Sequence, residues 1–345
     1  MKIYLAGTAV SKPKEEIKLQ ELFKQGCKLH SYFHCVDGFE RKWFRMNTRN
    51  KVDLFLDSGA FSAKNKNIEI DIQEYIEFIK INEKHINCYA NLDVIGNPKA
   101  TLKNQKIMEK AGLFPVPVFH FGEDPELYLK PLIGKYEYIA LGGLVVGANK
   151  RLIPWLDNIF KKYLLDKNMM PLIKVHGFGI TSFQLLFRYP WFSVDSTSWV
   201  VTGRVGSIFI PRYKNGKWVY NEPPLKIAVS SKSPNLKEAG RHIETLSPRQ
   251  KQIFVDYLND KHYVLGRSEF VEKSQTYELQ DNEKWAEKKP VDKKSKRLIE
   301  IIHEPGISNT YQLRDELNVS YYLEVEKALP EWPWAFAKEK KTLFS

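Results

Sequence analysis

The chain has 345 residues, of which 43% are hydrophobic, so it can bury a large core and does not have the composition of a disordered polymer. Its formal net charge at pH 7 is +12, which favours a polyanionic partner such as a nucleic acid. Its three cysteines form no CxxC pair and no apolar run is long enough to span a membrane, which favours a reducing, cytoplasmic setting without a membrane partner.

Short apolar runs alternate with helical patterns over the first part of the chain. The predicted strands are 2–7, 29–35, 52–57, 88–93, 115–120, 138–141, 171–176 and 192–195. Apolar residues at helical spacing lie between most of them, although residues 36–50 are expected to form a polar loop. This alternation predicts an α/β fold, specifically a (β/α)8 barrel of the TIM type. An open doubly wound sheet is the alternative, but no GxGxxG follows the first strand.

The residues after the eighth strand predict a β-hairpin and a helical extension. Residues 207–213 and 217–220 flank Asn215-Gly216, a pair typical of tight hairpin turns. We therefore expect a barrel domain at 1–262 that includes a basic hairpin at 207–220, followed by a charge-rich linker at 263–294. Residues 295–345 are expected to form a small helical module with helices at 295–303, 310–317 and 321–329.

Polar residues and glycines stand at the C-terminal ends of six predicted strands. They are Asp57, Asp93, His120, Gly142-Gly143, His176-Gly177 and Asp195. In a (β/α)8 barrel these ends meet on one face, where such enzymes carry their chemistry. Each residue alone could be a turn, cap or packing residue, whereas six converging strand ends predict an active site.

The residue types at these strand ends narrow the chemistry. Three carboxylates and two imidazoles without a cysteine ligand do not suit a structural zinc site, although a metal site of histidine and aspartate is an open alternative. Paired carboxylates also suit substitution at the anomeric carbon of a sugar. In that reaction one carboxylate is the nucleophile and the other is the acid/base.

Three segments resemble the tRNA-guanine transglycosylase superfamily, whose fold is a (β/α)8 barrel. They are Asp57-Ser58-Gly59-Ala60-Phe61, residues 140–147 and Val194-Asp195, in matching order over roughly residues 2–211. Ala60, Ser62 and the run from Asp195 to Trp199 are most similar to the DpdA branch, which phages and some bacteria encode. The resemblance implies an enzyme that exchanges guanine in DNA for a 7-deazaguanine, such as 7-cyano-7-deazaguanine. It would act in the cytoplasm, or in the host cytoplasm if a phage encodes it.

The resemblance also implies a role for each matching residue. Asp195 resembles the nucleophile that forms a covalent glycosyl-aspartate, and Asp57 resembles the general acid/base. Asp93 resembles the carboxylate that accepts hydrogen bonds from the base, and Phe61 would stack on that base. The other substrate-binding residues that it implies are Ser58, Gly59, His120, Gly142, Gly143, Leu144, His176 and Gly177.

One departure from the tRNA enzymes concerns zinc. Those enzymes carry a CxCxxC zinc site after the barrel, and this chain has no cysteine beyond Cys88. We therefore expect no metal and no cofactor, and we expect DNA and a free 7-deazaguanine base as partners. The alternatives are a tRNA-guanine transglycosylase and a non-catalytic barrel that binds nucleic acid, although the presence of both Asp57 and Asp195 argues against the latter.

The basic residues after the eighth strand are candidates for contact with the polymer. A run of Lys and Arg with interleaved aromatic residues is suited to phosphates and unpaired bases. The residues expected to contact the DNA backbone are Arg204, Arg212, Lys214 and Lys217.

Overall fold

The computed structural model describes residues 1–9, 13–144, 149–230, 238–287, 292 and 295–336. Contacts divide the chain into two compact units, each described here by itself. Unit 1 comprises Met1–Ser198 and Tyr322–Ser345, and unit 2 comprises Trp199–Tyr321. Among the described residues, no helix combines the length and the apolar character that a membrane crossing requires.

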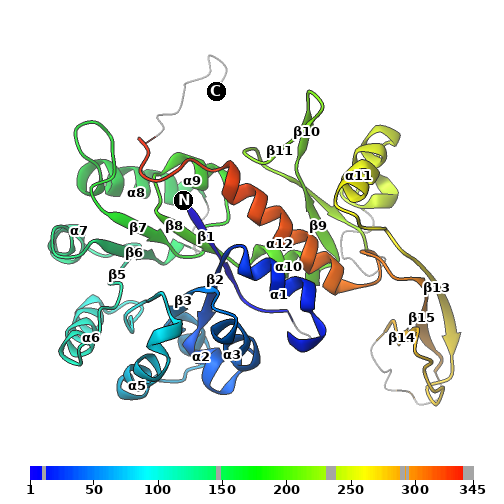
Figure 1. Cartoon of the computed structure of the whole chain (residues 1–345), viewed down its shortest axis with the longest axis horizontal. Coiled ribbons are helices and arrows are strands. Elements are labelled where there is room, and N and C mark those ends of the chain that lie inside the picture. Colours follow the sequence, from blue (N-terminus) through cyan, green and yellow to red (C-terminus); the bar gives the residue numbers. More distant parts are fainter. Residues whose placement is uncertain (10–12, 145–148, 231–237, 288–291, 293–294, 337–345) are drawn as a thin grey trace. The chain divides into compact units, whose positions relative to one another are not determined.

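Unit 1 is built on one curled sheet of eight parallel strands (Figure 1). In pairing order these are β4 (Cys88–Tyr89), β3 (Asp53–Asp57), β2 (Cys27–Ser31), β1 (Lys2–Ala6), β8 (Ser193–Ser196), β7 (Lys174–Gly177), β6 (Tyr138–Gly142) and β5 (Val118–His120). A parallel bridge between Ala90 and Val116 joins the segment after β4 to the segment before β5. The predicted α/β class is thus confirmed, and the sheet is consistent with a TIM-like fold.

Helices connect the strands of unit 1 and flank the sheet (Figure 1). They are η1 (Pro13–Glu15), α1 (Ile17–Lys24), α2 (Tyr32–Asp37), α3 (Arg41–Arg49), α4 (Ala60–Asn65), α5 (Ile72–Asn82), η2 (Glu83–His85), α6 (Pro98–Lys110), α7 (Pro125–Tyr128), η3 (Lys130–Leu132), α8 (Asn149–Ile159), η5 (Phe160–Leu164) and α9 (Phe183–Arg188). The Asp71 side chain caps α5 by accepting hydrogen bonds from the amides of Gln73 and Glu74.

The polar loop expected at residues 36–50 is wrong over most of its length, because α2 and α3 occupy this part of the chain. The buried residues of α3 are Trp43, Phe44, Asn47 and Thr48, which lie on one side of the helix. Their spacing along the chain is the sequence signal for this helix. Because the other positions of the helix are polar, the composition of the segment alone does not reveal this helical spacing.

The side chains of the strands alternate between the two faces of the sheet and pack into two separate hydrophobic clusters in unit 1. Phe55 packs with Tyr4 and Leu29 on one face of the sheet. Leu54 and Leu56, its chain neighbours, pack on the opposite face with residues of α5. Successive strand residues point to opposite faces, so the strands are buried on both sides, as parallel strands flanked by helices require.

Unit 2 begins with a helix and two short antiparallel ribbons. Strand β9 (Ser207–Ile210) pairs with β12 (Leu225–Ala228), and β10 (Arg212–Lys214) pairs with β11 (Lys217–Val219). Asn215 and Gly216 join β10 to β11 with φ angles of 49° and 75°, and positive values at both positions are typical of a type I′ turn. The helices of this part are α10 (Ser198–Arg204), η6 (Ile243–Thr245) and α11 (Pro248–Asp260).

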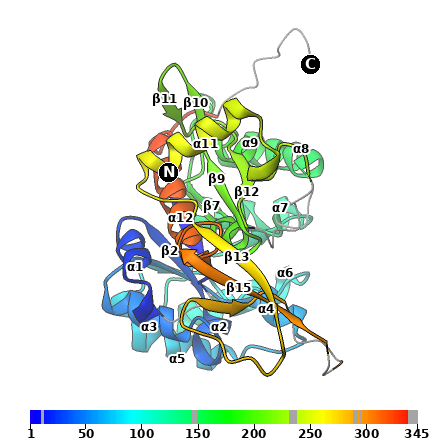
Figure 2. The same ribbon diagram turned by 90° about the vertical axis from the view of Figure 1, so that its right-hand side faces the viewer.

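The last part of unit 2 corrects the expected linker and helical module. Residues 263–294 contribute β13 (Arg267–Lys273) and β14 (Glu283–Trp285), which pair with β15 (Arg297–Glu304) in a three-stranded antiparallel sheet (Figure 2). The helix expected at 295–303 is therefore wrong, since β15 covers it. Ile299, Ile301 and Ile302 are β-branched, and such side chains favour strands.

The two last helices expected in the module are one helix, α12 (Tyr311–Ala328). The polar stretch around Asn318 resembles a helix break in the sequence. In the structure, Asn318 Nδ2 donates to the carbonyls of Trp199 and Ser207 at 3.1 and 3.3 Å, and its Oδ1 accepts from the Phe209 amide at 2.9 Å. Its side chain is satisfied by distant backbone groups, so the helix continues through it. Residues 337–345 of the expected module lie outside the described part of the chain.

Candidate functional site

Three carboxylates stand at or just after the C-terminal ends of three strands of the parallel sheet in unit 1. Asp57 ends β3, Asp93 follows β4 and Asp195 lies in β8. Burial, followed by the charges of Asp93 and Asp195, raises the pKa of Asp57 to about 8. Asp57 therefore keeps its proton at neutral pH. A protonated carboxyl beside carboxylates is the arrangement by which enzymes supply an acid at pH 7.

The turn after β3 fixes the position of Asp57. The Gly59 amide donates to Asp57 Oδ2 at 3.0 Å, and Gly59 has a φ of 81°. A side chain at Gly59 would overlap Ser31 and Phe33, so only glycine fits this turn. Two residues further on, Phe61 is 55% exposed, which leaves its ring free to stack on a planar ligand.

Asp93 is held by two hydrogen bonds. Ser58 Oγ donates to Asp93 Oδ1 at 2.9 Å, and His120 Nε2 lies 2.9 Å from Asp93 Oδ2. The other ring nitrogen of His120 lies 3.2 Å from Glu123 Oε1. Burial lowers the pKa of His120, but the hydrogen bonds with Asp93 and Glu123 outweigh it and raise this pKa to about 9. His120 is therefore a cation at neutral pH that donates to both carboxylates.

Asp195 is supported by a chain of polar side chains behind it. The Gly179 amide donates to Asp195 Oδ1 at 2.7 Å, and His176 Nε2 lies 3.3 Å from the same oxygen. His176 Nδ1 is 2.6 Å from Ser193 Oγ, which is 2.5 Å from the Tyr138 hydroxyl. Burial lowers the pKa of His176, despite the opposing effect of Asp195. With hydroxyls donating along the chain, the hydrogen of the neutral ring is on Nε2, which is buried and faces Asp195 outside hydrogen-bond geometry.

The predicted glycines have different local roles. A Cβ at Gly142 would lie 2.6 Å from His120 Cδ2, so the absent side chain makes room for the imidazole ring. Gly143 is exposed with a φ of 74°, and it can present backbone to a ligand. A Cβ at Gly177 would lie 2.8 Å from Ile180 Cγ1, so Gly177 serves packing. The Leu144 side chain is buried, and the last three motif residues, 145–147, lie outside the described part of the chain.

Sequence reasoning missed three side chains of this network: Glu123, Ser193 and Tyr138. Glu123 comes three residues after a histidine at a strand end, which is a local signal for a carboxylate that can reach back to the ring. Ser193 and Tyr138 lie inside predicted strands, where a polar side chain gives no sign of its partner. These residues hold the predicted ones in place.

The predicted polymer-binding residues belong to unit 2, whereas the three carboxylates belong to unit 1. Lys214 Nζ forms an ion pair with Glu222 at 2.6 Å, and Arg212 Nε donates to the Pro223 carbonyl at 2.9 Å. These two cations are therefore already engaged within the hairpin and its flank.

One group in the described part of unit 1 has the composition of a metal site. His30, Cys35 and Glu40 offer ligand atoms within 4.8 Å of one another, and all three are buried. Both ring nitrogens of His30 are engaged, Nδ1 with Glu40 at 3.0 Å and Nε2 with Asn47 at 2.7 Å. Burial also raises the pKa of the Cys35 thiol well above its ordinary value, which opposes the thiolate that a metal binds. The cluster is better suited to a structural hydrogen-bond network.

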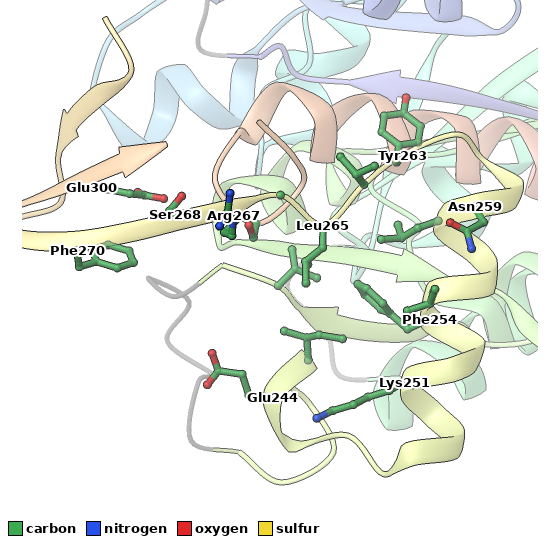
Figure 3. A pocket seen from close by; sticks show the side chains of 17 residues that line it. Glu244, Lys251, Phe254, Asn259, Tyr263, Leu265, Arg267, Ser268, Phe270 and Glu300 are labelled. Carbon is green, nitrogen blue, oxygen red and sulfur yellow. The ribbon is translucent and has the colours of Figure 1, made fainter. Parts of the chain in front are cut away.

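Unit 2 contains a hollow of about 680 Å³ between α11 and β13 (Figure 3). Its wall combines apolar side chains such as Phe254 and Leu265 with charged ones such as Lys251 and Arg267. None of the residues that line it was predicted as a site residue. It contains no cluster of carboxylates comparable with that of unit 1.

Compared with protein-family models, with curated proteins and with solved structures, this chain shows no match.

Proposed function

We propose that this chain is a DNA-guanine transglycosylase that exchanges guanine for a 7-deazaguanine, such as 7-cyano-7-deazaguanine, on a (β/α)8 barrel. The observation that carries the proposal is the placement of three carboxyl groups at strand ends of one sheet, where burial and the charges of Asp93 and Asp195 raise the pKa of Asp57 to about 8. Substitution at an anomeric carbon needs a nucleophile and a proton donor at the same time, and this set contains both.

In the first half of the proposed reaction, Asp195 attacks C1′ of the deoxyribose. The bond from C1′ to the base breaks, its electron pair leaves with the guanine, and Asp57 transfers its proton to the departing base. The product is a glycosyl ester on Asp195. The chain from Tyr138 to His176 orients Asp195 for this attack, and the Gly179 amide fixes the oxygen that it binds.

The second half reverses these steps with a different base. Asp57, now ionised, removes the ring proton of the incoming 7-deazaguanine. The base nitrogen then attacks C1′, and Asp195 leaves as a carboxylate. Both halves require only proton transfer and carboxylate attack, so the proposed reaction uses no metal and no redox cofactor. The cytoplasm is the proposed location, and it is that of the host if a phage encodes the chain.

Base recognition is assigned to Asp93, Phe61 and the backbone at Gly143. Asp93 accepts hydrogen bonds from Ser58 and His120, and each carboxylate oxygen has a further lone pair for a donor on guanine. The cationic His120 holds Asp93 in place through the contact between Nε2 and Oδ2. Because a paired base cannot reach such a site, the target nucleotide has to be flipped out or single-stranded.

Uptake of labelled guanine into polymer tests the proposal. Wild-type protein is incubated with labelled guanine and either duplex DNA or tRNA, and the label in each washed polymer is counted. Incorporation into DNA is the expected result, since guanine can replace guanine without any other reagent. Incorporation into tRNA alone would identify a tRNA-guanine transglycosylase. Incorporation into neither polymer would favour a non-catalytic barrel that binds nucleic acid.

A further inference from the structure

Helix α3 presents a purely cationic surface to solvent. Trp43, Phe44, Asn47 and Thr48 of this helix are buried. The exposed residues of the helix are Arg41, Lys42, Arg45 and Arg49, and no acidic residue lies between positions 41 and 49. An amphipathic helix usually mixes both signs on its solvent face, so a face with one sign is suited to a charged partner.

A hollow of about 560 Å³ lies beside this face in unit 1. We call it the α3 hollow, and its cationic lining consists of Lys14, Lys42, Arg45 and Arg49. Among the described residues that line it, Glu15 is the only carboxylate, so this part of the lining carries a net positive charge. Four cations around one concave surface repel one another, and a bound anion relieves that repulsion.

The side chains of these four cations form no hydrogen bond and no ion pair within the described part of the chain. Two cations of the hairpin differ, because Lys214 is paired with Glu222 and Arg212 donates to the Pro223 carbonyl. An unpaired cation can contact a phosphate without first breaking an internal ion pair. The cations of the α3 hollow are therefore more readily available to phosphates than those of the hairpin that the sequence predicts as the DNA contact.

We propose that the α3 hollow binds the phosphate backbone of a nucleic acid. This inference deepens the proposed function. Only the choice of DNA as the polymer rests on that function, whereas phosphate binding is inferred from the hollow itself. Arg45 and Arg49 follow Lys42 by three and seven residues, so the three side chains lie on one face of the helix. At about 1.5 Å per residue they span about 10 Å along its axis. A strand of B-DNA presents about three phosphates over that distance.

An anionic membrane is the competing partner for a cationic helix. Helices that bind membranes in this way insert an apolar face between the lipids. In α3 that face is committed to the protein core, where Trp43 is 1% exposed and Phe44 is 4% exposed. A nucleic acid needs no such insertion, so the burial of this face favours phosphates of a polymer.

The test compares two charge-matched triple variants by titration of a fluorescent oligonucleotide at several salt concentrations. The first is Lys42→Ala with Arg45→Ala and Arg49→Ala. The control is Lys99→Ala with Lys103→Ala and Lys106→Ala on α6, where the side chains are equally exposed. The α3 variant should flatten the slope of log affinity against log salt by roughly 2 to 3, while the control keeps the wild-type slope. The double variant Arg45→Lys and Arg49→Lys keeps both charges and should also keep the slope.

Thermal unfolding checks that each variant folds, as expected for changes at exposed positions. Equal slopes for wild type and the α3 variant would overturn the inference, as would equal flattening in both triple variants. So would a loss of binding to phosphatidylserine vesicles with unchanged oligonucleotide binding. Guanine exchange by wild type together with an unchanged slope would overturn this inference alone. A flattened slope without any exchange would instead overturn the proposed function.

Discussion

Asp195→Asn should abolish guanine exchange and leave the fold intact. The variant keeps an oxygen that can accept the Gly179 hydrogen bond, which is 2.7 Å long in the wild type. An amide cannot form the glycosyl ester, so the first half of the reaction has no nucleophile. We expect the initial rate of label uptake into DNA to fall at least about a thousand-fold, the scale on which enzymes lose activity without their nucleophile.

Asp71→Asn is the matched control for this variant. Asp71 caps α5 through the amides of Gln73 and Glu74, and asparagine caps helices about as well as aspartate. This control removes one carboxylate from the same unit and should keep the wild-type rate. A normal rate with Asp195→Asn would contradict the assignment and transfer the role of nucleophile to Asp57 or Asp93.

Asp57→Asn should cause the second large loss of exchange, because the departing guanine loses its proton donor. General acid catalysis contributes about a hundred-fold to ten-thousand-fold, and we expect a loss in this range. The same donor sets the pH dependence of the wild type. The pKa of Asp57 is raised to about 8, so the acid is present below this pH and is lost as pH rises through it. The kcat/KM of exchange should therefore be supported up to about pH 8 and decline above it.

The measurement is kcat/KM for guanine uptake across the alkaline range in wild type and Asp57→Asn. The wild type should show the alkaline decline, and the variant should lack it because it has no proton to lose there. A decline of the same shape in the variant would contradict the assignment. In that case another group with a raised pKa, such as His120 with its value of about 9, would control the profile.

The strand-end carboxylates could be predicted from sequence because two local signals coincide there. An apolar run of strand length followed by aspartate occurs at Asp57, Asp93 and Asp195, and the parallel α/β order brings such ends to one edge. The sequence distance between Asp57 and Asp195 is irrelevant once the strands are ordered. A carboxylate at a strand end is thus visible without any three-dimensional information.

The supporting contacts could not be predicted, because they depend on which strands are neighbours and on side-chain direction. His176 stands at a strand end like the aspartates, but the structure buries it completely against Ser193 and Asp195. Pairing between β7 and β8 creates these contacts. Strand β15 has β-branched isoleucines that favour a strand, but its pairing with β13 and β14 depends on partners that its own sequence does not reveal.

The α3 hollow illustrates the same limit for charge. The sequence favoured the basic hairpin, because Lys and Arg are dense there. The density of Lys and Arg in a sequence does not reveal which of them form ion pairs. In the structure, Glu222 forms an ion pair with Lys214. The cations of α3 stand among polar residues that resemble a loop, and only the helix brings them to one face.

The most direct test of the central claim is to locate a covalent adduct between DNA and protein. Wild-type protein is mixed with guanine-containing DNA without an incoming base, denatured during the reaction and digested for mass spectrometry. The account predicts a deoxyribosyl ester on Asp195, one released guanine per adduct, and no adduct with Asp195→Asn. Active exchange with no adduct, or with an adduct on a different residue, would contradict it.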